Sequence, residues 1–280
     1  MAAIQLVTKF QPYVDELFFA ESQRGLVTNT DFSFDGAKTV KIFKVSTVEM
    51  QDYDRSGANT QPGGSRYGTV GGIGNDVETY TLRKDRSFTF AIDKMDVDET
   101  AQTLAAAGAL ARQLREVTIP EIDAYIYDVM AKGAGTKAAA DSLTAGNIFD
   151  KILTGNNTLD NALAPDGGRV LIVTPDIYYM MKRSKDIVME TETGADMRLR
   201  GVISNLDGLR VVKVPAARLP EKFGFMIAHP IATVAPVKLA DYKVHTDPPG
   251  LSGSLVEGRF YFDAFVLENK AKAIYYQPVK

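Results

Sequence analysis

The stretch that decides the fold is Tyr80-Thr-Leu-Arg-Lys-Asp-Arg-Ser-Phe-Thr-Phe-Ala-Ile-Asp93, followed by Lys94-Met-Asp-Val-Asp-Glu-Thr100. Apolar and polar side chains alternate along residues 80–93, which is the period of a strand with one buried face. Lys84, Asp85 and Arg86 interrupt this alternation with charge. Asp96, with Glu99 three residues later, has the pattern of a helix N-terminal capping box. The sequence therefore predicts a strand that leads directly into a helix.

A long helix is predicted over residues 97–133. One apolar stripe runs along its first part, at Leu104, Ala107, Ala111, Leu114 and Val117. At about 1.5 Å per residue, the part from 97 to 117 would be roughly 30 Å long. Thr118-Ile-Pro-Glu121 has the pattern of a second capping box with proline in the first turn. We therefore expect a second helix to begin there and to end near Gly133.

Upstream, the β-branched stretch Thr39–Val48 is predicted to pair with residues 77–92 in a long hairpin that spans residues 37–93. Its tip, residues 49–76, contains seven glycines, at 57, 63, 64, 68, 71, 72 and 74. A connection this long is uncommon inside a compact domain and is usually functional or mobile. A lone two-stranded ribbon is marginally stable and has unpaired edges, so we expect another chain to cover it.

Residues 1–36 form an N-terminal segment with a predicted helix between Pro12 and Gly25. Leu17, Phe18 and Phe19 supply its apolar face. A helix of about three turns is not stable alone in water, so this face must lie on other protein. Two interpretations remain open: a terminal helix docked on its own domain, or an arm docked on a neighbouring subunit.

The rest of the chain is predicted to be a compact α+β domain followed by a last pair of strands. Between residues 134 and 246, helical patterns alternate with short apolar strands. These strands are Val170–Val173, Leu209–Val214 and Phe223–Ala228, and Asp207-Gly208 is a hairpin-type turn. Residues 255–267 and 270–277 are expected to form a strand pair beside the long helix.

The composition excludes several classes of function. The 280 residues include no Cys, so disulfides, thiolate zinc sites and a Cys nucleophile are excluded. Of the two His, His229 is expected to cap the end of an apolar strand or to pack in the core, and His245 to be solvated. The net charge of −3 argues against a chain whose main task is to grip nucleic acid. No stretch is long and apolar enough to span a membrane.

The sequence has no complete ligand-binding motif. Residues 52–57 begin like a calcium-binding loop, but position twelve is Gly63 instead of glutamate. Gly133-Ala-Gly-Thr-Lys137 lacks the spacing of a phosphate-binding loop. The basic cluster at Lys182, Arg183 and Lys185 is interpreted as a solvated face. We therefore predict no catalytic residue, no metal and no cofactor.

The order of these parts resembles the major capsid protein of tailed double-stranded-DNA bacteriophages, whose fold is shared with encapsulins and the herpesvirus capsid floor. The resemblance covers essentially the whole chain, although no single motif is diagnostic. The segments that carry it, besides residues 80–93, are Arg66-Tyr67-Gly68, Asp98-Glu-Thr100, Pro120-Glu-Ile-Asp-Ala-Tyr125, His229-Pro-Ile-Ala-Thr-Val-Ala-Pro236 and Gly258-Arg-Phe-Tyr-Phe-Asp-Ala-Phe-Val266.

The resemblance implies an α+β chain in four parts. They are an N-terminal arm (1–36), an extended β-hairpin loop (37–93), a peripheral domain with a spine helix (94–133 and 247–280) and an axial domain (134–246). It implies an icosahedral shell of hexamers and pentamers around the phage DNA, without catalysis and with only non-specific DNA contact. A separate scaffolding protein, a portal and a decoration protein are the implied partners. Assembly is expected in the host cytoplasm, and no membrane is involved.

Specific side chains are expected at the contact between subunits. Leu17, Phe18 and Phe19 would be buried where the arm docks, while Arg66 and Tyr67 would contact a neighbour from the hairpin tip. Two alternatives stay open at this point. One is an encapsulin-like nanocompartment shell, and the other is a soluble α+β enzyme that uses carboxylates.

Overall fold

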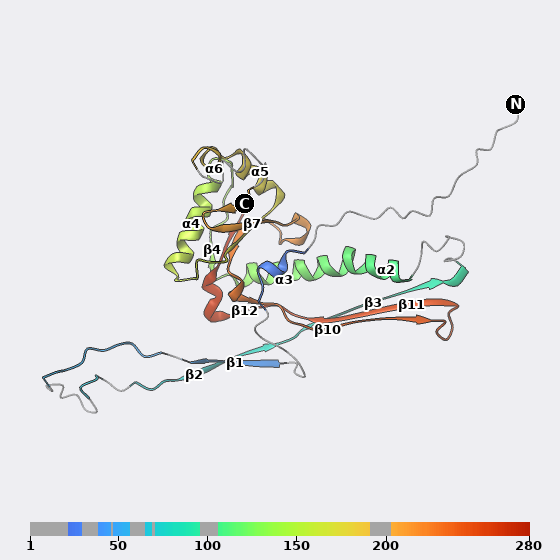
Figure 1. The fold of residues 1–280 in the computed structure, drawn as a ribbon, viewed down its shortest axis with the longest axis horizontal. Coiled ribbons are helices and arrows are strands. Elements are labelled where there is room, and N and C mark those ends of the chain that lie inside the picture. Colours follow the sequence, from blue (N-terminus) through green and yellow to red (C-terminus); the bar gives the residue numbers. More distant parts are fainter. Residues whose placement is uncertain are drawn as a thin grey trace. The chain divides into compact units, whose positions relative to one another are not determined.

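The computed structural model describes residues 22–29, 39–45, 47–56, 65–68, 71–95, 106–190 and 203–280. The chain divides into two compact units. The smaller unit, Phe34–Leu82, contains a two-stranded hairpin and its tip. The larger unit, Met1–Ser33 with Arg83–Lys280, contains a three-stranded sheet, a long helix and a six-stranded sheet (Figure 1). No helix among these residues is long and apolar enough to cross a bilayer.

The hairpin of the smaller unit is shorter than the sequence predicts. Strand β1 (Thr39–Val45) pairs antiparallel with β2 (Asn75–Thr81), from Thr39 opposite Thr81 to Val45 opposite Asn75. The predicted pairing is therefore correct up to Thr81 and wrong beyond it. The next strand, β3 (Lys84–Asp93), belongs to a different sheet.

Strand β3 pairs with β11 (Gly253–Phe262), which lies between β3 and β10 (Val237–Thr246) in the larger unit. The ladder runs from Lys84 opposite Phe262 to Asp93 opposite Gly253. Phe88 lies over Gly258, where a Cβ atom would be 2.4 Å from its ring, and stacks on Phe260 at 6.3 Å. This partner buries the aromatic face of β3, which explains why the strand leaves the hairpin.

One continuous helical rod packs against this sheet. It consists of α2 (Ala106–Gln113), a π-helical turn (Leu114–Thr118) and α3 (Ile119–Gly133), and Figure 1 shows it beside β3 and β11. The predicted second helix is confirmed in its bounds, with Pro120 in its first turn, but the predicted capping box is wrong, because Thr118 has helical dihedral angles and makes no side-chain capping bond. Pro120 has no N–H to donate, and the Ile119 N–H bonds to Leu114 O, five residues back.

The six-stranded sheet carries the rest of the larger unit. Its strands, in spatial order, are β4 (Thr136–Lys137), β13 (Ile274–Pro278), β8 (Phe223–Ala228), β5 (Val170–Val173), β7 (Leu209–Lys213) and β6 (Asn205–Leu206). Its helices are α4 (Ile148–Asn161), α5 (Pro175–Arg183) and α6 (Lys185–Glu190). A small pair, β9 (Thr233–Val234) with β12 (Phe265–Val266), accompanies it.

Several sequence predictions can be compared with this sheet. The strands at 170–173 and 223–228 are confirmed. The Asp207-Gly208 turn is confirmed too, with φ of 50° and 75° and Leu206 opposite Leu209. The predicted pairing of 255–267 with 270–277 is wrong, because β13 pairs with β8 and β4 instead of β11. Strand β13 is apolar on both sides and needs a place inside a sheet.

The core consists of two apolar clusters on the two faces of this sheet. In β5, Val170 and Ile172 belong to the cluster that also contains α3 and the aromatic side chains of β11. Leu171 and Val173 belong to the cluster that contains α4 and α5. Alternate side chains of a single strand therefore join the two clusters, as the two-residue period of a strand requires.

The turn after α4 contains a strained residue. Leu163 has φ of 57°, and its side chain is 90% exposed. The N–H of Leu163 donates to Asp160 O and that of Ala164 to Leu159 O, which is the Schellman pattern with leucine where glycine is usual. Arg169, 1% exposed, holds the turn by donating to Ala164 O and Pro165 O.

We predict that Leu163→Gly stabilises the unassembled subunit by about 0.5–1 kcal/mol. The left-handed conformation costs a residue with a Cβ atom roughly 1–2 kcal/mol. Part of this gain is lost, because glycine also increases the conformational entropy of the unfolded chain. Urea unfolding measures the change. Leu163→Ala is the control, since it removes the exposed side chain but keeps the Cβ atom. Equal stabilities of the two variants would contradict the assignment of strain.

Candidate subunit interface

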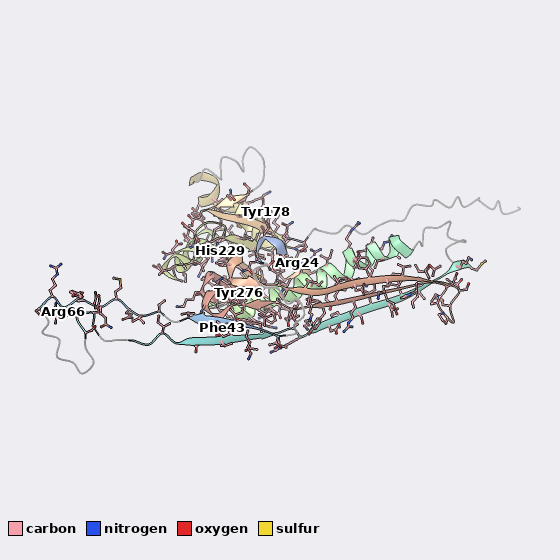
Figure 2. The ribbon with its side chains drawn as sticks, turned by 60° about the horizontal axis from the view of Figure 1, so that its bottom comes forward. Arg24, Phe43, Arg66, Tyr178, His229 and Tyr276 are labelled. Atoms are coloured by element: carbon pink, nitrogen blue, oxygen red, sulfur yellow. The ribbon has the colours of Figure 1, made fainter. Side chains whose placement is uncertain are left out.

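One face of the β1–β2 hairpin exposes three apolar side chains close together. Phe43 and Val45 on β1 are 66% and 69% exposed, and Val77, directly opposite Phe43 on β2, is 45% exposed. The alternation of the strand sends these side chains to the same face. Exposed apolar side chains that lie together in this way mark an interaction surface. We call Phe43, Val45 and Val77 the hairpin face, and Figure 2 labels Phe43 on it.

The other face of the hairpin includes polar side chains that are paired with one another. Lys44 forms an ion pair with Glu78, and the Tyr80 hydroxyl donates to the same carboxylate. On the same face as Phe43, Thr39 and Thr81 form a cross-strand pair at the end of the hairpin and join their hydroxyls at 3.0 Å. These polar contacts stabilise the ribbon without using the three side chains of the hairpin face, which are left available for another partner.

The hairpin tip brings Arg66 and Tyr67 to an exposed turn, as Figure 2 shows for Arg66. Ser65 and Gly68 exchange backbone bonds across it, and Gly68 has φ of 87°. The Asp54 N–H donates to Arg66 O at 2.8 Å. The Tyr67 ring, on a residue 79% exposed, meets Tyr53 edge-on at 5.0 Å between centroids. The turn therefore has internal contacts that the glycine count did not predict.

Sequence reasoning missed other apolar side chains beside the tip. Val48, Met50 and Ile73 are 47%, 100% and 69% exposed. The signal was present in the sequence, since these large apolar residues stand among glycines and polar residues. The seven glycines of the tip are the more conspicuous feature of the same segment. Together with the hairpin face, these residues extend the exposed apolar character of the smaller unit along the chain.

Leu17, Phe18 and Phe19 lie outside the described residues, but the segment that follows them is firmly held. Asp123 of α3 is fully buried and accepts hydrogen bonds from Ser22 Oγ at 2.8 Å and Arg218 at 3.0 Å. Arg24 approaches the same carboxylate at 3.4 Å. Three donors offset the cost of burying this charge. They also fix the chain at residues 22–24 to the larger unit.

The titratable groups of the described chain do not converge on a reactive centre. His229 Nδ1 accepts from the Ile231 N–H, while Nε2 lies 2.9 Å from Gly167 O, so the ring caps a turn as expected. His245 is exposed beside Glu257, at 3.2 Å. Within the described ranges, no group of three or more His, Cys, Asp or Glu could hold a metal ion.

Solved structures with this fold are numerous. A protein from Mycobacterium phage Che8 is 19% identical, with a TM-score of 0.76 over 98% of this chain and 96% of that one. The capsid structure of the cyanophage P-SCSP1u is 15% identical, with a TM-score of 0.78 over 98% and 93% of the two chains. A virus-like particle from Pyrococcus furiosus is 10% identical, with a TM-score of 0.54 over 92% of each chain. At these identities the likeness shows the fold.

The sequence itself matches a family model. No curated protein matches the chain by sequence. The model described as phage capsid protein, however, matches residues 76–277. The matched range begins in β2 and runs through the long helix and the six-stranded sheet to β13. The match covers most of the chain, and this chain therefore belongs to the phage capsid protein family.

Proposed function

We propose that this capsid protein builds its shell by docking the hairpin of residues 34–82 on a second copy of the chain. Members of its family are structural proteins of the virion capsid, which requires self-association. The observation that carries the proposal is the hairpin face, where Phe43 and Val45 are about two-thirds exposed on a ribbon of two strands. Burying one such side chain contributes roughly 1.5–3 kcal/mol.

Arg66 and Tyr67 complete this contact in the proposal. A flat tyrosine ring and a guanidinium group are the side chains most often found at the energetic centre of an interface. Both are exposed, and the Tyr53 ring limits the freedom of Tyr67. A ring that is already restrained loses less conformational entropy on binding than a free one. The turn at residues 65–68 is therefore suited to contact a neighbouring subunit.

The finished shell in this proposal is icosahedral, made of hexamers and pentamers, and encloses double-stranded DNA. The net charge of −3 supports confinement of DNA without tight or sequence-specific binding. A separate scaffolding protein, a portal and a decoration protein are the further partners proposed, with assembly in the host cytoplasm. A nanocompartment shell and a carboxylate enzyme are not favoured, since the family match is to phage capsid proteins.

We predict that replacing residues 52–74 with a short Gly-Ser turn gives a folded, soluble subunit that no longer forms shells. The strands β1 and β2 lie outside the deleted segment, so they keep their pairing. Thermal unfolding reports the fold, and electron microscopy with sedimentation reports the particles. Particles of normal size and stability would show that the tip takes no part in assembly.

We predict that Phe43→Ser with Val45→Ser lowers the yield of particles at least tenfold and leaves subunit unfolding almost unchanged. Both side chains are mostly exposed in the single chain, so their loss costs it little. Lys41→Ser is the matched control, because Lys41 is exposed on the same face of β1 but is polar. Sedimentation of the assembly reaction measures the yield. A similar loss with Lys41→Ser would argue against an apolar contact.

We predict that Phe18→Ala impairs assembly more than it impairs folding of the larger unit. An arm buried against a neighbour would contribute roughly 1.5–3 kcal/mol per large apolar side chain to the contact between subunits. Unfolding of the unassembled subunit, compared with the protein concentration needed for assembly, separates the two effects. Equal losses of subunit stability and of assembly would favour a terminal helix docked on its own domain.

A further inference from the structure

Four charged residues in succession, Arg83–Arg86, begin the second segment of the larger unit, Arg83–Lys280. Of the two boundaries between the units, Ser33/Phe34 and Leu82/Arg83, this run follows the second, where the chain passes from the hairpin unit back into the larger unit. In the sequence the run interrupts the apolar alternation of a strand. In the structure each of the four residues makes its own contact with another segment of the larger unit.

The first contact is with a buried carboxylate. The Arg83 backbone N–H donates to Asp263 Oδ2 at 2.8 Å. The Tyr125 hydroxyl of α3 donates to Asp263 Oδ1 at 2.6 Å, and the Ala264 N–H donates to the same oxygen at 2.8 Å. Asp263 is 2% exposed, and three donors compensate for its burial. Residues before β3, after β11 and on α3 therefore meet at one side chain.

The remaining contacts surround this centre. Lys84 Nζ lies 4.8 Å from the centre of the Tyr125 ring. Asp85 forms two bonds with Arg259, at 3.0 and 2.6 Å, and Arg86 lies 2.6 Å from a Glu121 oxygen. The last two pairs are largely exposed, so each adds little to stability. Asp263 is therefore the member of the group whose loss has the largest effect.

The Tyr125 hydroxyl keeps the proton that it donates to the Asp263 carboxylate. Burial, followed by its hydrogen bond to Asp263, raises the pKa of Tyr125. The phenol thus stays protonated throughout the neutral and moderately alkaline range. The Asp263 contacts hold the chain at a position that lies just outside the β3–β11 ladder.

We propose that Asp263 is a positioning residue for assembly. By holding the backbone at Arg83, it fixes where the chain passes from the hairpin back into the larger unit, so that every copy presents its hairpin to a neighbour from the same starting point. The inference rests on the proposed docking of the hairpin on a second copy. Loss of the Asp263 contacts leaves the hairpin face intact, but the backbone at Arg83 is no longer held in one position. The particles therefore become uneven in size.

The test compares Asp263→Asn with the wild-type chain. Asn offers one acceptor oxygen and brings an NH2 group against donors, so the bond to Arg83 or to Tyr125 is lost. Hydrogen exchange in the peptide containing Leu82–Lys84 should become at least tenfold faster. Electron microscopy at a temperature where both proteins are folded should show a broader distribution of particle diameters. Should Asp263→Asn fail to fold, Tyr125→Phe decides, because it removes one donor and leaves the carboxylate bonded to two backbone N–H groups.

Two controls separate positioning from general destabilisation. Ile152→Val shortens a fully buried side chain of α4 and lowers stability without touching the contacts of Asp263. Asp85→Asn breaks the adjacent exposed pair with Arg259. Both should give particles of uniform diameter. Uniform particles from the Asp263 variant, despite faster exchange at Arg83, would overturn this inference alone, whereas a wild-type chain that forms no particles would overturn the proposed function.

Discussion

The ladder between β3 and β11 is the constraint on which the rest of the larger unit depends. It joins two stretches far apart in the sequence over ten residues of β3, and it buries the aromatic face that β3 would otherwise expose. The long helix packs on this sheet through Ile122, Ile126 and Met130 of α3, which share a cluster with Phe260 and Phe262 of β11. Without the ladder, neither the helix nor the start of the six-stranded sheet would have an apolar surface to lie on.

Two buried carboxylates connect segments to this framework. Asp123 binds residues 22–24 and Arg218, and Asp263 binds the start of β3 to α3. An unpaired carboxylate at either place would be strongly destabilising, because a buried charge needs donors that replace water. Both sites are therefore specific: only a chain that brings the correct donors together can bury the group. Asp263 lies next to the point where the chain passes from the hairpin unit into the larger unit, and Asp123 ties residues 22–24 to α3.

The hairpin, in contrast, keeps several apolar side chains exposed to solvent. Polar side chains of its other face are paired with one another, whereas the hairpin face and the side chains of Met50 and Ile73 remain exposed. Exposed apolar patches on a folded chain are usually small and rimmed by polar groups. Two strands and a glycine-rich tip fulfil this condition. The cost is low stability of the ribbon alone, which contact with a neighbouring copy would offset.

The sequence by itself determined the local elements and the class of protein. The apolar runs of β5 and β8, the helix α3, the Asp207-Gly208 turn and the ordered set of capsid-like segments were readable because they depend on neighbouring residues, whereas the first part of the predicted long helix, residues 97–105, lies outside the described residues. The placement of Arg66 and Tyr67 together on the tip followed from their adjacency. Their role in a subunit contact stays a prediction.

Only the tertiary structure decided which strands are partners. From Tyr80 to Ile92 the sequence shows a single alternating pattern, broken only by the charged run. The chain nevertheless changes from one sheet to another at that run. The hydrophobic pattern of a strand indicates which of its faces is buried, but it does not identify the segment that covers this face. By the hydrophobic pattern alone, β1 and β11 are both suitable partners. The same limit hid the pairing of β13 with β8 and the meeting of Arg83, Tyr125 and Asp263. These depend on contacts between residues distant in the chain, whose geometry the completed fold alone specifies.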